Sequence, residues 1–308
     1  MTGRELKLGL LVVIALFGVW FLRAFLAGLR RVARGPSGPG APPAARPSAA
    51  ELGTGFITVF FDTFGIGSFA TTTAIFRARR LVPDELIPGT LNVGHTPSAV
   101  LSAFVFIGLV PVAAGTLLPM IAAAGLGAWL GSGIVARLAR YRVRLGMGTA
   151  LLVAACVMLL TQLGRLPGGG DALALHGARW AVAVLGNFVL GGLMTLGIGL
   201  YAPCMILISL LGMNPLAAFP IMMGSCAFLM TISGVRFLRE ERYHPSAALA
   251  LTLGGIPALL IAAYAVKSLP VGAVRWVVIV VVLYTGLTLL DAGRRELKAA
   301  PAPRVRPA

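Results

Sequence analysis

Charged residues are scarce in this chain of 308 residues, and acidic residues are the scarcest of them. Only 12% of the residues are charged, with 10 Asp and Glu against 26 Lys and Arg, while 58% are hydrophobic. A typical soluble domain is about 25% charged. The mean hydropathy is +0.91. This composition excludes an ordinary soluble domain and predicts a membrane protein.

Residues that carry common enzyme and metal chemistry are also few. Cys156, Cys204 and Cys226 all lie within apolar runs, and their odd number argues against a disulfide framework. No Cys and His spacing is typical of a metal site. The chain contains no GxSxG, HExxH or Walker motif and no close carboxylate pair within an apolar run. We therefore expect no enzyme activity, no built-in ATPase, no metal and no cofactor.

Basic residues give the chain a net charge of +16. A large positive charge is also common in proteins that bind nucleic acid. Here, however, the Lys and Arg residues lie almost entirely between apolar runs, where they orient membrane helices. We therefore expect the lipid bilayer as a partner and no nucleic acid.

Nine apolar runs are long enough to cross or to enter a bilayer, which takes about 20 residues per helix. They are rich in Gly, Ala, Leu and Val, and they lack the alternating strands of about ten residues that form membrane barrels. The predicted fold class is therefore an all-α integral membrane protein. The runs lie at 8–29, 52–76, 85–109, 111–136, 145–163, 178–211, 215–237, 246–267 and 271–290.

Two segments of the chain are copies of one another. Residues 63–88 read TFGIGSFATTTAIFRARRLVPDELIP, and residues 195–220 read TLGIGLYAPCMILISLLGMNPLAAFP. An offset of 132 residues aligns both Gly-Ile-Gly triplets and also aligns Pro83 with Pro215. Paired hydrophobic segments that glycine interrupts at matching positions are typical of a transporter's binding site.

The basic residues distinguish two topologies. If every run crosses the membrane, Arg77, Arg79 and Arg80 face away from the basic linker, against the positive-inside rule. If 52–76 and 178–211 instead enter and leave on the same side, 20 of the 26 basic residues share one side. This re-entrant topology makes the two halves inverted repeats and places the C-terminus in the cytoplasm. Full crossing stays open, because 178–211 is long.

The chain divides into five parts. We expect an extra N-terminal transmembrane helix at 1–29, retained rather than cleaved because no small-x-small cleavage site clearly follows it. A basic linker rich in Pro and Gly follows at 30–50. The two repeat halves occupy 51–166 and 177–293, and a disordered basic tail occupies 294–308.

The glycine breaks suggest how an anion would bind. Glycine is poorly suited to the interior of a helix, where each one costs up to about 1 kcal/mol relative to alanine. The four glycines of the breaks are Gly65, Gly67, Gly197 and Gly199. A helix that restarts after a break presents free N–H groups and the positive end of its dipole, which bind anions. Two such ends that meet from opposite sides would form an anion cradle. The alternative is that these glycines only permit close helix packing.

Polar residues beside the breaks extend this candidate site. The hydroxyls of Ser68, Thr71 and Thr72 either donate to a bound oxyanion or, as the alternative, bond to their own helix. In the second copy Pro203 replaces Thr71, which favours a helix start there because proline in a first turn loses no hydrogen bond. The substrate-binding candidates are completed by Asn92, Tyr201 and Ser225.

Two ionisable residues are candidates for proton coupling. Asp62 lies three residues before Gly65, and His95 lies in a polar break early in the following run. An ionisable group within a membrane segment is a functional candidate by default, and histidine titrates close to neutral pH. The alternatives are an ion pair of Asp62 with an arginine and a structural, hydrogen-bonded His95.

The ordered set of motifs resembles the sulfite exporter TauE/SafE family of membrane permeases, over roughly residues 52–290. The resemblance rests on the two Gly-Ile-Gly triplets, on Pro83 and Ala202-Pro203 downstream of them, and on GAWLGSGIVARLARYRVRLGMG at 127–148. It implies a multi-pass transporter of the plasma (inner) membrane that exports sulfite, sulfonates or other small organic anions.

We therefore expect a secondary transporter, an exporter of a small anion such as sulfite or an organosulfonate, that works by alternating access. The alternative is a non-transporting scaffold or a subunit of a larger membrane complex, which would not need paired breaks near the middle of the membrane. Assembly as a homo-oligomer stays open.

Overall fold

The computed structural model describes residues 3–34, 46–65, 67–134, 140–165, 170–194, 200–268 and 270–299. Over these residues the chain forms helices and no strand, and six helices are long and apolar enough to cross a membrane. The chain is therefore a multi-pass helical membrane protein, as its composition predicts. The helices are α1 (Gly3–Arg34), α2 (Ala49–Thr63), α3 (Ser68–Arg79), α4 (Ile87–Leu109), α5 (Ala114–Ile134), α6 (Arg140–Gln162), α7 (Gly177–Met194), α8 (Tyr201–Leu210), the 3-10 turn η2 (Pro215–Ala217), α9 (Ala218–Arg239), α10 (Pro245–Ser268) and α11 (Val271–Ala299).

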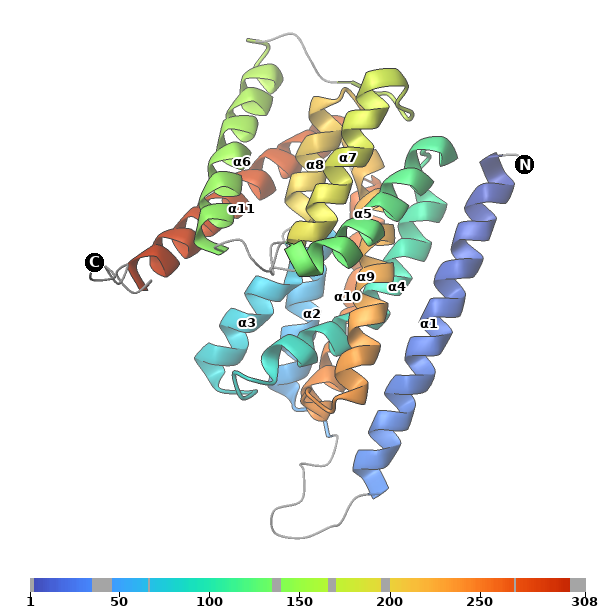
Figure 1. The fold of residues 1–308 in the computed structure, drawn as a ribbon, viewed down its shortest axis with the longest axis vertical. Coiled ribbons are helices and arrows are strands. Elements are labelled where there is room, and N and C mark those ends of the chain that lie inside the picture. The colour runs from blue at the N-terminus through green and yellow to red at the C-terminus, as the bar shows by residue number, and fades with distance from the viewer. Residues whose placement is uncertain are drawn as a thin grey trace, which may run out of the picture.

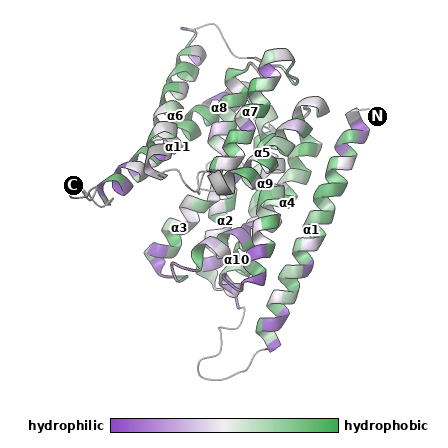
Figure 2. Cartoon of the chain, in the orientation of Figure 1, coloured by the Kyte–Doolittle hydropathy of each residue, from purple (hydrophilic) through white to green (hydrophobic). Residues whose placement is uncertain are grey.

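The first long helix, α1, stands at the edge of the molecule (Figure 1) and packs mainly against α9 and α4. Its outer face is apolar, and Leu16 is 64% exposed. Such a face is suited to lipid rather than to water. Figure 2 shows hydrophilic residues gathered at the lower ends of α1 and α3, while hydrophobic residues dominate the middle of the helices.

The first repeated segment is interrupted between α2 and α3. Ser48 and Glu51 form a capping box at the start of α2, which satisfies free N–H groups there. The helix ends at Thr63, and Gly65 and Gly67 then take φ values of +95° and +85°. Glycine adopts this left-handed region without strain, which explains why a helix of otherwise apolar residues stops here. A second helix, α3, restarts at Ser68.

The helices that flank the two breaks form two pairs at different ends of the molecule. Figure 1 shows α2 and α3 in its lower half and α7 and α8 in its upper half. Contacts join α2 to α3 and α7 to α8. Residues 195–199, between α7 and α8, include the second Gly-Ile-Gly triplet and lie outside the described residues.

Two helix crossings use the same kind of contact. In each of them, a glycine of the first helix lies against the backbone of the second. A glycine of the second helix likewise lies against the backbone of the first. A Cβ atom at any of these glycines would collide with that backbone, so small residues set the close approach. In α5 against α7 the contacts are Gly127 to Phe188 and Gly191 to Ala124; in α10 against α2 they are Gly254 to Leu52 and Gly55 to Leu251.

Two further antiparallel pairs complete the bundle. In one of them α4 lies against α9, with the ring centroids of Phe106 and Phe219 5.2 Å apart. In the other α6 lies against α11, where Gly148 and Gly286 each approach the carbonyl of the other. Figure 1 shows the α6 and α11 pair at the left side of the bundle.

Candidate functional site

The first break holds a carboxylate on a helix N-terminus. One side-chain oxygen of Asp62, Oδ1, accepts a hydrogen bond of 2.6 Å from the backbone N–H of Ser68, the first residue of α3. The backbone N–H of Gly65 donates to the carbonyl of Asp62 at 2.8 Å. The dipole of α3 stabilises a negative charge at this position. The chain's own carboxylate therefore lies where an external anion was expected.

The beginning of α8 lies against this first break. The Tyr201 hydroxyl lies close enough to the Asp62 carboxylate and to the thiol of Cys226 on α9 to interact with both. A Cβ atom on Gly65 would lie 2.5 Å from the Sδ atom of Met205. Two segments that lie 132 residues apart in the sequence, and that repeat one another, therefore meet in space.

Hydroxyls of α3 behave differently from one another. Thr71 donates to the carbonyl of Ser68 at 2.9 Å, which is the helix-bonding alternative. Thr72 instead hydrogen-bonds to Nε2 of His95 at 3.1 Å, and the ring of Phe69 stacks on the same imidazole with centroids 6.0 Å apart. His95 is 2% exposed. These contacts attach α3 to α4, and they place His95 beside the first break.

Asn92 lies between α4 and α9. Its Nδ2 donates to the carbonyl of Pro88 at 2.9 Å, and its Oδ1 accepts from the hydroxyl of Ser233 at 2.7 Å. Both ends of the amide thus have protein partners, so the structure gives Asn92 a role in joining two helices.

Ser225 lies in a second polar cluster, between α5, α7 and α9. Its hydroxyl donates to the carbonyl of Ile221 at 2.8 Å and accepts from Nδ2 of Asn187 at 3.4 Å. The same Nδ2 atom donates to the carbonyl of Met120 at 2.7 Å. Sequence reasoning missed Asn187, although it is the one amide side chain in the apolar run 178–211.

The second break is described only at its two flanks, where α7 ends at Met194 and α8 begins at Tyr201. Gly197 and Gly199 lie outside the described residues. The following helix begins at Tyr201, which places Pro203 in its first turn as the sequence predicts.

No basic residue balances Asp62 in the part of the chain that the structure describes. The six ion pairs formed there involve other residues, and most of them are exposed. Within the same residues, no group of three or more His, Cys, Asp or Glu side chains is placed to hold a metal ion. The alternative, an ion pair of Asp62 with an arginine, is thus absent among the described residues, where Asp62 accepts from Ser68 and interacts with Tyr201.

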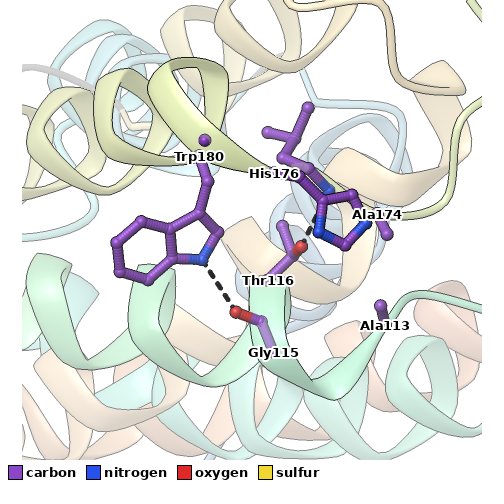
Figure 3. Close-up of a pocket in the computed structure, with 8 residues that line it drawn as sticks. Ala113, Gly115, Thr116, Ala174, His176 and Trp180 are labelled. Atoms are coloured by element: carbon purple, nitrogen blue, oxygen red, sulfur yellow. Dashed lines mark hydrogen bonds between the residues drawn. The ribbon is translucent and has the colours of Figure 1, made fainter.

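A separate cavity of about 300 Å³ lies at the start of α5 and α7 (Figure 3). The Nε1 atom of Trp180 donates to the carbonyl of Gly115 at 2.8 Å, and the N–H of Leu175 donates to the hydroxyl of Thr116 at 3.1 Å. Its lining also includes His176 but none of the residues that the sequence predicts for the site.

Comparisons with protein-family models, with curated proteins and with solved structures give no match to this chain. What the chain does must therefore be argued from its own residues.

Proposed function

We propose that this protein is a secondary transporter of the plasma membrane, an exporter of a small anion such as sulfite or an organosulfonate. The observation that carries the proposal is the contact of the first break with the start of α8, through Asp62 and Tyr201. Transporters built from repeats place their substrate where discontinuous helices of the two halves meet.

The helix crossings support an inverted duplication. The glycine contacts of α5 with α7 and of α2 with α10 correspond when residues of α5 are shifted by 127 positions and residues of α2 by 136. Gly127 and Ala124 then map onto Gly254 and Leu251, while Gly55 and Leu52 map onto Gly191 and Phe188. The remaining pairs, α4 with α9 and α6 with α11, each join a helix to its own counterpart. Such a pattern is expected when two halves are related by a two-fold axis.

The placement of the two helix pairs that flank the breaks supports re-entry from opposite sides. With α2 and α3 at one end of the bundle and α7 and α8 at the other, each pair would enter the membrane, break and return. This is the topology that puts most of the basic residues on one side, which we assign to the cytoplasm together with the C-terminus.

The bonds of Asp62 suggest how transport is coupled. A substrate anion would bind the N–H of Ser68 and the hydroxyl of Tyr201, both of which now contact the Asp62 carboxylate. The carboxylate and the anion repel each other as long as both are charged. We therefore propose that Asp62 takes up a proton when the anion binds, so that binding of the anion is linked to protonation of Asp62.

Flux into proteoliposomes tests this function. Labelled sulfite would be offered with and without a pH gradient, with unlabelled sulfonates and carboxylates as competitors. We expect saturable flux that sulfonates inhibit and that a pH gradient drives. Protein shown to be folded that moves none of these anions would refute the proposal and favour the non-transporting scaffold.

A further inference from the structure

Two buried polar atoms on α4 have no hydrogen-bond partner among the described residues. They are Nδ1 of His95 and the hydroxyl oxygen of Ser98, in side chains of residues that are 2% and 3% exposed. Buried polar groups are nearly always hydrogen-bonded, because an unpaired one costs about 1–3 kcal/mol. Two such atoms one helical turn apart therefore need an explanation.

The usual acceptor of Ser98 already has a donor from another helix. A serine within a helix commonly donates to the carbonyl four residues earlier, which here belongs to Gly94. That carbonyl instead accepts a hydrogen bond of 2.9 Å from the hydroxyl of Thr252 on α10. The Ser98 hydroxyl is left as a donor with no acceptor from the described chain.

The bond between Thr72 and His95 is compatible with two tautomers of the imidazole. Thr72 has one hydrogen bond among the described residues, to Nε2 of His95, and the carbonyl of Ser68 that it would otherwise use accepts from Thr71. If the hydroxyl of Thr72 donates, Nε2 is the unprotonated nitrogen of a neutral imidazole; in the other tautomer Nε2–H donates to the Thr72 oxygen. The subsite proposed below uses the first tautomer, in which Nδ1 carries a hydrogen and is a second donor without an acceptor among the described residues.

His95 and Ser98 lie on one face of α4. Residues three apart on a helix are neighbours on one face. His95 contacts α3 through Thr72 and Phe69. The hydroxyl oxygen of Ser98 lies 2.7 Å from the position of a Cβ on Gly255, a glycine of α10 that Val59 of α2 also approaches. His95 thus faces α3, and Ser98 faces α10 at the place that Val59 of α2 also approaches, one turn before Asp62.

We propose that His95 and Ser98 form a donor subsite that binds one oxygen of a small oxyanion. Two N–H and O–H donors with no acceptor between them suit an oxyanion and disfavour a cation. The proposal rests on the transport function proposed above, and it adds Ser98 to the binding residues while making His95 a donor to the substrate. At the offset of 132 residues the second half has Ala227 and Met230, so this subsite exists only in the first half.

Ser98→Ala tests the subsite, because a structural role and a binding role predict different results. The hydroxyl has no partner to lose within the described protein, so the melting temperature in detergent should stay the same or rise slightly. The KM for sulfite should rise about ten-fold to a hundred-fold, as expected for a lost hydrogen bond to a charged oxygen. Sulfite should also raise the melting temperature of wild-type protein but not that of Ser98→Ala.

Thr231→Val is the matched control. Its hydroxyl is equally buried, but it donates to the carbonyl of Ala227 at 2.6 Å within α9, so its loss should leave the KM for sulfite unchanged. A wild-type KM in Ser98→Ala, with wild-type protein active, overturns the subsite, assigns the two donors to bound water and leaves the transport function standing. Absence of flux in wild-type protein overturns both.

Discussion

The two repeated segments share a sequence pattern but differ in how tightly they are packed. In α8, residues 201–206 are all buried, and Ile206 is 7% exposed. At the equivalent positions of α3, Thr71 and Thr73 are half-buried and Ala74 is exposed. The reason is that α8 packs against α6, α7, α9 and α11, whereas α3 packs mainly against α2 and α4.

Their chemistry differs in the same sense. The first half has Asp62, Thr72 and His95 around its break, and the second half has Met194, Cys204 and Ala227 at the matching positions. The looser segment is thus the polar one, and the tightly packed segment is apolar. Under the proposed alternating access, this asymmetry is what one conformation of two inverted halves would show, with the α3 end open and the α8 end closed.

Filling the first break should have the largest effect. In Gly65→Leu the side chain would meet Met205, and the backbone would have to keep a φ of +95°. Positive φ costs a bulky residue about 1–3 kcal/mol, and overpacking costs about 1–3 kcal/mol more. We expect loss of flux and a clearly lower melting temperature.

The control for that change is Gly53→Leu, which lies on α2 before the same break. A Cβ there meets nothing within 4 Å, so flux and melting temperature should stay close to wild type. An equal loss of flux in both variants would show that leucine is harmful anywhere on α2 or at its break. The contact of Gly65 with Met205 would then not account for the effect.

Removing the charge of Asp62 should change coupling rather than binding. In Asp62→Asn an amide oxygen can still accept from the N–H of Ser68, but the side chain can no longer take up a proton. We expect exchange of labelled for unlabelled sulfite to persist while net flux loses its dependence on a pH gradient. A variant that the gradient still drives would remove Asp62 from the coupling step.

Labelling of single cysteines should sharpen the difference in packing. In a Cys156→Ser background, which removes an exposed thiol, Ala74→Cys on α3 should react with a soluble maleimide much faster than Ile206→Cys on α8. Sulfite that shifts the protein toward its other conformation should slow the first reaction and accelerate the second. Equal rates at both positions would mean that the two ends are equally closed.

Thr71→Val should have the smallest effect. Its hydroxyl donates to the carbonyl of Ser68 in its own helix, and that bond contributes little once the helix has formed. We expect a stability within about 0.5 kcal/mol of wild type and an unchanged KM. A large rise in the KM would mean that Thr71 leaves its helix bond and contacts substrate.

Parts of the site could be predicted because local rules govern them. Pro203 indicates a helix start, and α8 begins at Tyr201; paired glycines indicate a break, and Gly65 and Gly67 form one. Ser98 and Asn187 were missed for a physical reason. A single serine or amide in an apolar run commonly bonds to its own or a neighbouring helix. Nothing in the local sequence therefore shows that Ser98 has no partner among the described residues or that Asn187 joins three helices.

Composition and pattern by themselves determined that this chain is a helical membrane protein, where its helices break, and that one segment of it repeats. Those properties depend on residues close together in the sequence and on the cost of exposing backbone to lipid. Only the tertiary structure decided that Asp62 would lie on the start of α3, that Tyr201 would join it from the other half, and that Thr252 would take the acceptor of Ser98. Each of these depends on which helices become neighbours, and that is settled by packing over the whole bundle rather than by any one segment.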